Sequence, residues 1–467
     1  MIVMKFGGSS LEDAICIRRA VDIVLQHREE RPVVVVSAIG KTTQALVQLG
    51  HTALANGLTA ATPLLDDLLQ HHRTVLGDLG VAVEIAAEID RGIGHLGKRI
   101  ARLLEGVSLL QDLTPRTEDA IIGNGERFST LLFSAAAGNA GLDVVRVDAT
   151  KVIITDARHR MARPDRNEIL ARAAATLQPL IEAHRIPVIE GFIGATNEGT
   201  PTTMGFEASD YTASLLGAAL GASEIQIWTD VRGILTTGSP GIENVLSIRE
   251  LSFDEAAELS FFGAKVLHPR TIDPAAEGNI PVRILHSRHP QDAGTTIFQA
   301  PAHVGSAVKS IALKEDVIVV YASSPRPVPA HRTMAFLGKT LDRHEVSPHL
   351  LTVSGHRVGF GVAAQAGLDV ALVELSKTLQ VSREEDCVIV SLVGSDTGTA
   401  PDIAARAIET IRGIPILLIS YGASDTSLSL AVLGKDAHEV VVKLHREFFG
   451  AGIPDTQIAQ ADGEVRP

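Results

Sequence analysis

The sequence predicts an α/β protein with a mainly parallel sheet in its first 300 residues and a smaller, repeated α/β arrangement after them. Apolar runs such as residues 33–36 alternate with helical patterns, which is typical of strands buried on both faces of a parallel sheet. From residue 311 onward the order strand–helix–strand–strand occurs twice. With 467 residues, the chain is too long for one hydrophobic core, so we expect two or three domains.

The composition argues against several classes of protein, namely membrane-spanning, disulfide-rich and nucleic-acid-binding proteins. Hydrophobic residues make up 45% of the chain and charged residues 21%, as in ordinary globular proteins. No apolar run is long enough for a membrane span, and the first residues lack the layout of a signal peptide, so we expect a cytoplasmic protein. Cys16 and Cys387 lie too far apart in sequence to suggest a disulfide framework or a metal cluster. The net charge of −13 argues against nucleic-acid and membrane partners.

The chain opens with an apolar strand at residues 2–4, followed by a helix and by a second strand at residues 33–37. In parallel sheets, ligands bind beyond the carboxyl ends of the strands. Paired glycines at such an edge let phosphate oxygens approach the backbone. The lysine precedes the glycines, so this is not a P-loop. The residues expected at the edge are Lys5, Gly7, Gly8, Ser9, Ser37 and Gly40.

The middle of the first region contains a leucine-rich segment and a glycine turn. Residues 62–116 are leucine-rich and predict an inserted pair of helices, and residues 121–129 predict a strand, a glycine turn and a helix start. Glu126 is either a first-turn carboxylate favoured by the helix dipole or a contact to a substrate ammonium group, and the spacing leaves both open.

Residues 202–213 predict a polar turn that opens a helix between two strands, at residues 188–195 and 224–230. Ser209 is the expected N-cap, and Asp210 places a carboxylate in the first turn. Alone, the segment is either an ordinary capped helix or an anion site at a helix N-terminus.

A helix at residues 253–262 leads to Lys265, which follows a glycine and precedes an apolar turn, so we do not expect it on a free solvated face. Two strands close the first region, and residues 300–306 predict a linker. The expected domains are therefore residues 1–300 and residues 307–467.

Taken in order, these motifs resemble aspartate kinases over nearly the whole chain. The resemblance rests on Lys5-Phe6-Gly7-Gly8-Ser9-Ser10, Val36-Ser37-Ala38 with Gly40, Gly125-Glu126, Gly191-Phe192-Ile193-Gly194, Trp228-Thr229-Asp230-Val231 and Phe262-Gly263-Ala264-Lys265-Val266-Leu267-His268-Pro269. It implies the three-layer amino-acid-kinase sandwich, here residues 1–300, followed by two intertwined ferredoxin-like ACT units. Such proteins usually pair, so a homodimer or a dimer of dimers is expected.

The resemblance also implies an activity. It is the ATP-dependent phosphorylation of the side-chain carboxylate of L-aspartate, with Mg²⁺, to 4-phospho-L-aspartate, the first step toward lysine, threonine and methionine. The implied catalytic residues are Lys5, Asp210 and Lys265. Those implied for ATP are Gly7, Gly8, Ser9, Thr229, Asp230 and Lys265, and those for aspartate are Ser37, Thr43, Glu126 and Ser209.

The ACT region implies feedback by an amino acid, lysine or threonine. The expected pocket is bordered by a strand-to-helix turn at residues 323–331 and a strand start at residues 349–354. Its candidate residues are Ser323, His331, His349, Thr352 and Ser354.

Three motifs depart from the family pattern. Phe206 stands where the family commonly has an arginine that holds a substrate carboxylate, and phenylalanine cannot make that bidentate contact. If another cation serves, the nearest by motif position is Arg127 or Arg163. The loop at residues 236–240 lacks a second arginine, and the usual acidic pair of lysine-sensitive members is replaced near residues 349–355. Two alternatives stay open: a kinase of the same fold for another carboxylate acceptor, and a catalytically weak amino-acid sensor.

Overall fold

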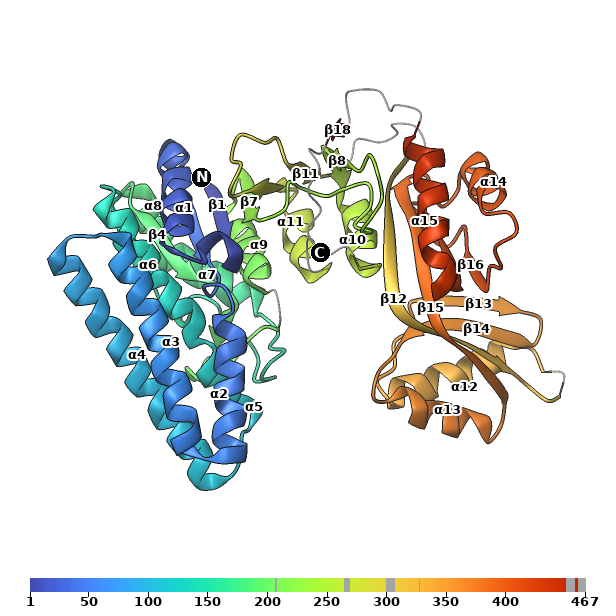
Figure 1. Ribbon diagram of the computed structural model, residues 1–467, viewed down its shortest axis with the longest axis horizontal. Coiled ribbons are helices and arrows are strands. Elements are labelled where there is room, and N and C mark those ends of the chain that lie inside the picture. Colours follow the sequence, from blue (N-terminus) through green and yellow to red (C-terminus); the bar gives the residue numbers. More distant parts are fainter. Residues whose placement is uncertain (206–207, 264–268, 300–306, 327, 451–457, 461–467) are drawn as a thin grey trace. The chain divides into compact units, whose positions relative to one another are not determined.

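The computed structural model describes residues 1–205, 208–263, 269–299, 307–326, 328–450 and 458–460 (Figure 1). The chain forms two compact units. Unit 1 comprises Met1–Gly233 and Leu267–Gln299, and unit 2 comprises Ile234–Val266 and Ala300–Pro467. The segment between residues 234 and 266 therefore groups with the C-terminal part of the chain. The predicted linker at residues 300–306 lies outside the described residues.

Unit 1 is built on a mainly parallel sheet, as the apolar runs predict. Its strands follow the order β3-β4-β2-β1-β7-β10-β11, parallel to one another except for β11, which is antiparallel to β10. They are β1 (Ile2–Phe6), β2 (Val33–Val36), β3 (Val144–Val147), β4 (Ile186–Glu190), β7 (Glu224–Thr229), β10 (Val282–His286) and β11 (Thr295–Phe298). A small hairpin of β5 (Ile193–Ala195) and β6 (Pro201–Thr203) follows β4. Every residue of β1, β2 and β4 is buried, which explains why their sequences are continuous apolar runs.

Helices cover both faces of this sheet and complete the expected three-layer sandwich. One layer holds α6 (Asn124–Asn139) with α1 (Ala14–Gln26) beside it, and the other holds α7 (Arg166–Thr176), α8 (Gln178–Glu182), α9 (Ala208–Leu220) and α11 (Pro269–Glu277). The inserted helical pair is also confirmed. It consists of α3 (Leu58–Leu79) and α4 (Val83–Leu110), packed with α2 (Thr42–Asn56).

Two local predictions in unit 1 are wrong. Residues 121–122 are not a strand but the end of helix α5 (Pro115–Ile122). Thr114 caps this helix by accepting a hydrogen bond from the N–H of Thr117, and Pro115 occupies its first turn, where proline is favoured. Ser209 is not the N-cap of α9, because the helix already begins at Ala208.

Unit 2 contains a six-stranded sheet with the order β13-β14-β12-β15-β17-β16. The strands are β12 (Ala307–Ser323), β13 (Leu350–Ser354), β14 (Arg357–Ala363), β15 (Gln380–Ser395), β16 (Leu418–Ser420) and β17 (Ser427–Leu433), and all paired neighbours are antiparallel. The helices are α12 (Ala330–Arg343), α13 (Leu368–Ser376), α14 (Pro401–Thr410) and α15 (Gly434–Phe449).

The two βαββα units of this sheet share their long strands. Val308 and Ile311 of β12 belong to a core with α14 and α15, whereas Val320 and Ala322 of the same strand belong to a core with α12 and α13. Each core therefore uses half of β12, and the two ferredoxin-like units are intertwined, as expected.

The segment that precedes this sheet in sequence adds β8 (Leu246–Ile248), β9 (Glu250–Ser252) and α10 (Phe253–Phe261) to unit 2. The strand β18 (Ile458–Gln460) pairs antiparallel with β8.

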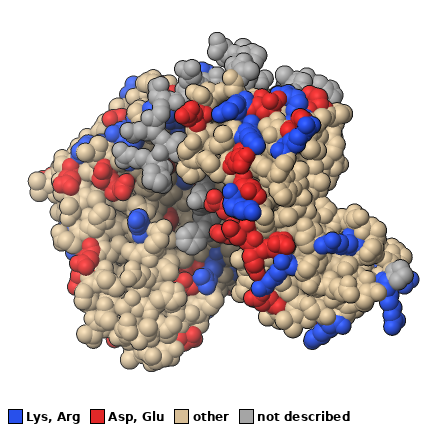
Figure 2. Space-filling view, turned by 45° about the vertical axis from the view of Figure 1, so that its right-hand side comes forward, with Lys and Arg blue, Asp and Glu red and all other residues tan. Residues whose placement is uncertain are grey.

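Charge is mixed on the surface. On the face shown in Figure 2, the Lys and Arg side chains of the described residues are interspersed with Asp and Glu. None of the described helices has both the length and the apolar character that crossing a membrane requires.

Candidate active site

A buried ion pair lies at the carboxyl edge of the parallel sheet. Lys5 is near the end of β1, and its Nζ lies 2.5 Å from Oδ1 of Asp210 in the first turn of α9. Both side chains are about nine-tenths buried, at 10% relative exposure each. A buried charge is stable only with a partner, so each residue fixes the position of the other. The structure thus brings two of the three expected catalytic residues together.

The glycines that follow Lys5 make close backbone approaches. A Cβ on Gly8 would lie 2.8 Å from the carbonyl oxygen of Ala38, so only glycine fits beside the turn after β2. A Cβ on Gly7 would lie 3.5 Å from Nζ of Lys5, which places the ammonium group next to this turn. The N–H of Gly7 donates to the carbonyl of Trp228 at 3.0 Å. This N–H therefore completes the sheet edge.

Glu126 reaches the same edge from helix α6. It is buried, and its Oε1 accepts a hydrogen bond from the N–H of Ala38 at 3.2 Å. Its Oε2 is buried without a hydrogen-bond partner among the described residues. Ser37 and Thr43, on either side of this turn, are partly buried. The structure therefore places Ser37 and Thr43 on either side of the turn after β2 and Glu126 against the backbone of that turn.

The environment of Glu126 favours its neutral form. Burial raises the pKa of its carboxyl group to about 8, and the charge of Glu190 contributes in the same direction. Glu190 ends β4, accepts from the N–H of Ala149 at 2.7 Å, and also has a pKa raised by burial. An ammonium group at the free oxygen of Glu126 would offset the cost of burying its ionised carboxylate.

The remaining expected contacts lie on neighbouring elements. Ser209 is buried, and a Cβ on Gly191 would lie 2.6 Å from its Cβ, so α9 begins directly against the end of β4. Thr229 ends β7 and donates from Oγ1 to Oδ1 of Asp230 at 3.1 Å. Asp230 itself is exposed.

Several expected groups are not placed at the site. Lys265 and Phe206 lie outside the described residues. Of the two arginines considered as substitutes for the missing arginine, Arg127 pairs with Asp148 at 3.2 Å and Arg163 is exposed.

One residue next to the site was not foreseen. Asp119, on α5, has a fully buried side chain, and it accepts from Oγ1 of Thr203 at 2.6 Å, from Nδ1 of His159 at 2.8 Å and from the N–H of Arg160 at 3.1 Å. It holds the loop at residues 156–163 against the strand that leads to α9. An aspartate within a helix gives no sequence signal for such long-range bonds.

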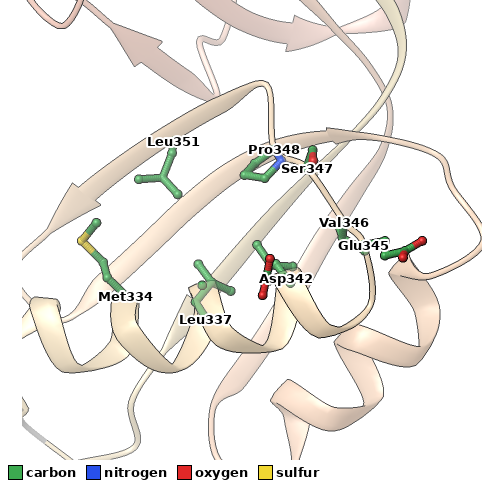
Figure 3. A pocket seen from close by; sticks show the side chains of 10 residues that line it. Met334, Leu337, Asp342, Glu345, Val346, Ser347, Pro348 and Leu351 are labelled. Carbon is green, nitrogen blue, oxygen red and sulfur yellow. The ribbon is translucent and has the colours of Figure 1, made fainter. Parts of the chain in front are cut away.

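The predicted effector residues lie in the first ferredoxin-like unit. Ser323 ends β12, His331 is exposed at the start of α12, and His349, Thr352 and Ser354 lie along β13 or just before it. Beside them, between α12 and β13, is a groove of about 600 Å³ (Figure 3). Its lining differs from the predicted set and consists of Met334, Leu337, Gly338, Leu341, Asp342, Glu345, Val346, Ser347, Pro348 and Leu351.

Comparison with known proteins identifies the class to which this fold and site belong. Residues 1–286 match the amino acid kinase family, and residues 390–448 match the ACT domain. The chain is 34% identical to lysine-sensitive aspartokinase 3 of Escherichia coli, over 96% of this chain and 99% of the relative. It is 32% identical to chloroplastic aspartokinase 1 of Arabidopsis thaliana, over 96% and 80% of the two chains.

Solved structures agree. E. coli aspartokinase III in complex with aspartate and ADP, described as the R-state, superposes with a TM-score of 0.83 at 33% identity, over 96% of this chain and 100% of that one. The same enzyme with lysine and aspartate, described as the T-state, gives 0.80 at 33% identity, over 96% and 99% of the chains. The chain therefore belongs to the aspartokinases.

Proposed function

We propose that this protein transfers the γ-phosphoryl group of ATP to the side-chain carboxylate of L-aspartate and releases 4-phospho-L-aspartate. The observation that carries the proposal is the buried pair of Lys5 and Asp210 beside the glycine turn, at the sheet edge where ligands of parallel sheets bind. The E. coli relative, described in complex with aspartate and ADP, supports the same pair of ligands here.

The chemistry needs few groups. A carboxylate is already ionised at neutral pH and attacks phosphorus without a general base, so catalysis consists of positioning and of neutralising charge on the phosphoryl oxygens. Lys5 supplies a cation, and Asp210 holds its Nζ in one place. We assign the same neutralising role to Lys265.

Mg²⁺ fits the groups present. It is usually bound through one or two carboxylates together with nucleotide phosphates. No cluster of three or more potential ligands occurs among the residues that the structure describes, but Asp210 and Asp230 each offer a carboxylate at the sheet edge. When bound, the ion neutralises charge on the β- and γ-phosphates.

The acceptor site would use the free oxygen of Glu126 for the ammonium group of aspartate, with Ser37, Thr43 and Ser209 as hydrogen-bonding neighbours. A test is to incubate the enzyme with ATP, Mg²⁺ and hydroxylamine and to measure the hydroxamate formed from L-aspartate, L-glutamate and N-acetyl-L-glutamate. We expect product from aspartate only, and none from the Asp210→Asn variant. Equal product from all three acceptors would refute the assignment.

Phe206 favours a second candidate, a kinase of the same fold for another carboxylate acceptor. The arginine that holds a second substrate carboxylate in the family is absent at this position, which allows an acceptor whose second carboxylate lies elsewhere. Hydroxamate from glutamate or N-acetylglutamate, but not from aspartate, would select this candidate.

For regulation we propose feedback by lysine or threonine at the groove between α12 and β13. Its lining includes the apolar Leu337 and Leu341 and the acids Asp342 and Glu345. Figure 3 labels Leu337, Asp342 and Glu345. Such a groove suits a ligand with an alkyl chain and an ammonium group, and the E. coli relative is described with lysine bound. Titrating both amino acids into the hydroxamate assay tests the proposal, and the variant Asp342→Asn should weaken inhibition.

Pairing of two chains is a further proposal. The strand β13 lies at the edge of its sheet and exposes the apolar side chains of Leu351 and Val353. An exposed apolar edge strand pairs readily with another chain. Light scattering coupled to gel filtration should give the mass of a homodimer or of a dimer of dimers.

The cytoplasmic location remains a prediction.

A further inference from the structure

The buried carboxylate of Asp119 on α5 joins three segments of unit 1. Its Oδ1 accepts from Oγ1 of Thr203 on β6 at 2.6 Å, and its Oδ2 accepts from Nδ1 of His159 at 2.8 Å. The N–H of Arg160 lies 3.1 Å from both oxygens. Burying a carboxylate is costly unless donors surround it, and here each donor comes from a segment far from α5 in sequence. Asp119 therefore holds these segments in one arrangement.

The loop at residues 156–163 lies on the chain that leads from β6 to α9. The N–H of Ala162 donates to the carbonyl of Thr203 at 3.0 Å. Gly205 has a φ of +98°, which other residues rarely adopt, and a Cβ there would lie 2.9 Å from Sδ of Met161. The first turn of α9, with Ser209, follows directly. The loop and Asp119 together fix the approach of the chain to this turn.

Helix α5 is fixed just as closely to the start of α6. Gly123 connects the two helices, and its N–H donates to the carbonyl of Asp119 at 3.1 Å. A Cβ on Gly123 would lie 3.0 Å from Cγ2 of Ile193 on β5, so this connection lies against the hairpin of β5 and β6. Glu126 is in the first turn of α6. The bond between Asp119 and Thr203 therefore links the helix before Glu126 to the strand before α9.

We infer that Asp119 is a positioning residue for the acceptor: its bond to Thr203 sets the spacing between the first turns of α6 and α9. The proposed function assigns acceptor contacts to Glu126 on the first of these turns and to Ser209 on the second, and the inference rests on that assignment. An acceptor that contacts both turns fits at one spacing only. Loss of the bond therefore raises the acceptor KM more than the KM of ATP, whose expected contacts follow β1 and β7.

The test uses full-length Thr203→Val, which removes the hydroxyl and keeps the shape of the side chain, and Thr203→Ser, which keeps the hydroxyl. The acceptor is the one that yields hydroxamate with the wild type. The acceptor KM should rise about tenfold in Thr203→Val and stay within about twofold of wild type in Thr203→Ser, with the KM of ATP within about twofold in both. Asp119→Asn should raise the acceptor KM at least as much, because either orientation of its amide turns an N–H toward the N–H of Arg160.

The matched control is Thr202→Val, the same change at the neighbouring residue of β6. Thr202 is also buried, but its Oγ1 lies 2.6 Å from Oγ1 of Thr155 and does not link β6 to α5. A merely structural role of buried hydroxyls predicts that both valine variants behave alike. We expect Thr202→Val to lose stability while its acceptor KM stays within about twofold of wild type. The fluorescence of Trp228, the single tryptophan, reports whether unit 1 is folded, and the Thr203 variants decide the test if Asp119→Asn does not fold.

Hydrogen exchange without ligands gives a second readout that does not depend on the acceptor. Thr203→Val should speed exchange in peptides spanning residues 124–130 and 208–214, and Thr202→Val should not. A wild type that phosphorylates none of the three acceptors would refute the proposed function, and the exchange comparison would still decide whether Asp119 links the two turns. The inference is overturned if exchange in both segments matches the wild type in Thr203→Val. It is equally overturned if Thr203→Val keeps the wild-type acceptor KM, or if Thr203→Ser or Thr202→Val raises that KM as much as Thr203→Val does.

Discussion

The two units of this protein place charge in opposite ways. Unit 1 buries acids and a base next to its sheet edge, whereas in the described part of unit 2 both ferredoxin-like cores are apolar and the single buried charge is Glu255 on α10. Among the described residues of unit 1, the buried aspartates, glutamates, lysines and arginines are Lys5, Glu118, Asp119, Glu126, Glu190 and Asp210. Uncompensated burial is expensive, so such a concentration is a sign of chemistry.

The strand arrangement of the two sheets explains this difference in buried charge. A parallel sheet brings successive loops and helix N-termini to one edge, where they can form a site for an anion. An antiparallel sheet with two strands shared between two cores has no such edge, but a change in one core alters strands that the other core also uses. The comparison places the buried charges of the proposed chemistry in unit 1, and the following predictions test it.

The largest effect is expected from Lys5→Met. Removing the cation from the buried pair should lower kcat at least about a hundredfold while ATP affinity changes less, because the charge that Lys5 neutralises develops in the transition state. Steady-state kinetics with ATP and aspartate measure both constants. Lys265→Met should behave in the same way.

The matched control is Lys98→Met, which removes an exposed lysine from α4 and should leave kcat unchanged. Near-normal turnover in Lys5→Met would remove Lys5 from the mechanism. It would also revive the alternative of an amino-acid sensor with little catalytic activity, because the buried charges of unit 1 would then need another explanation.

The second prediction concerns pH. Because burial raises the pKa of Glu126 to about 8, its carboxyl group is protonated below that pH in the empty site. An acceptor ammonium group requires the ionised form, so acceptor binding releases a proton, and the acceptor KM should rise about tenfold per pH unit as pH falls below about 8. Kinetics between about pH 6.5 and about pH 8.5 measure this slope.

Two variants test whether Glu126 causes this pH dependence of the acceptor KM. Glu126→Gln should abolish the slope and leave the KM high throughout. Glu190→Gln removes a neighbouring negative charge, which should lower the pKa of Glu126 and move the rise in KM to lower pH. A wild-type KM that does not depend on pH would refute the ammonium contact.

The sequence analysis predicted the parallel sheet correctly. A strand that is buried on both faces is a continuous apolar run, as in β2, and such strands are typical of parallel sheets. The prediction was wrong at residues 121–122, where an apolar pair before a glycine fits a strand end and a helix end equally, and the cap at Thr114 decides. It also underestimated β12 and β15, whose pairing continues through both cores.

For the site, the motif order predicted that Lys5 and Asp210 would act together, and the structure brings them within 2.5 Å. It did not predict Asp119, because its partners lie far away in sequence. A single sequence does not show which polar groups far apart along the chain form hydrogen bonds or ion pairs with one another.

A smaller effect is expected at Phe206. If the acceptor carboxylate lacks an arginine there, Phe206→Arg should lower the acceptor KM about threefold to tenfold, since a bidentate contact to a carboxylate contributes on the order of 1 kcal/mol. The variants Arg127→Ala and Arg163→Ala test for a substitute cation. Arg127 already pairs with Asp148, so we expect the larger rise in KM from Arg163→Ala. If all three leave the KM unchanged, the acceptor carboxylate is held by other groups.

The last prediction concerns stability and tests whether unit 1 depends on its buried polar groups. His72 is fully buried, with Nδ1 donating to the carbonyl of Leu68 at 2.7 Å and its ring 4.4 Å from that of Phe128. Burial lowers its pKa to about 4 from 6.5. The native state therefore excludes a proton that the unfolded chain binds, and stability should fall as pH drops from about 6.5 toward 4, by up to about 1.4 kcal/mol per pH unit.

Urea unfolding followed by the fluorescence of Trp228 measures this slope in unit 1 alone, since the single tryptophan lies on β7. His72→Phe should reduce the slope below pH 6.5, at some cost in overall stability from the lost hydrogen bond. His71→Phe is the matched control, because His71 is the adjacent but exposed histidine and should leave the slope unchanged. An unaltered slope in His72→Phe would show that other groups determine the acid sensitivity of unit 1, and the contrast in buried charge between the units would then not extend to their stability.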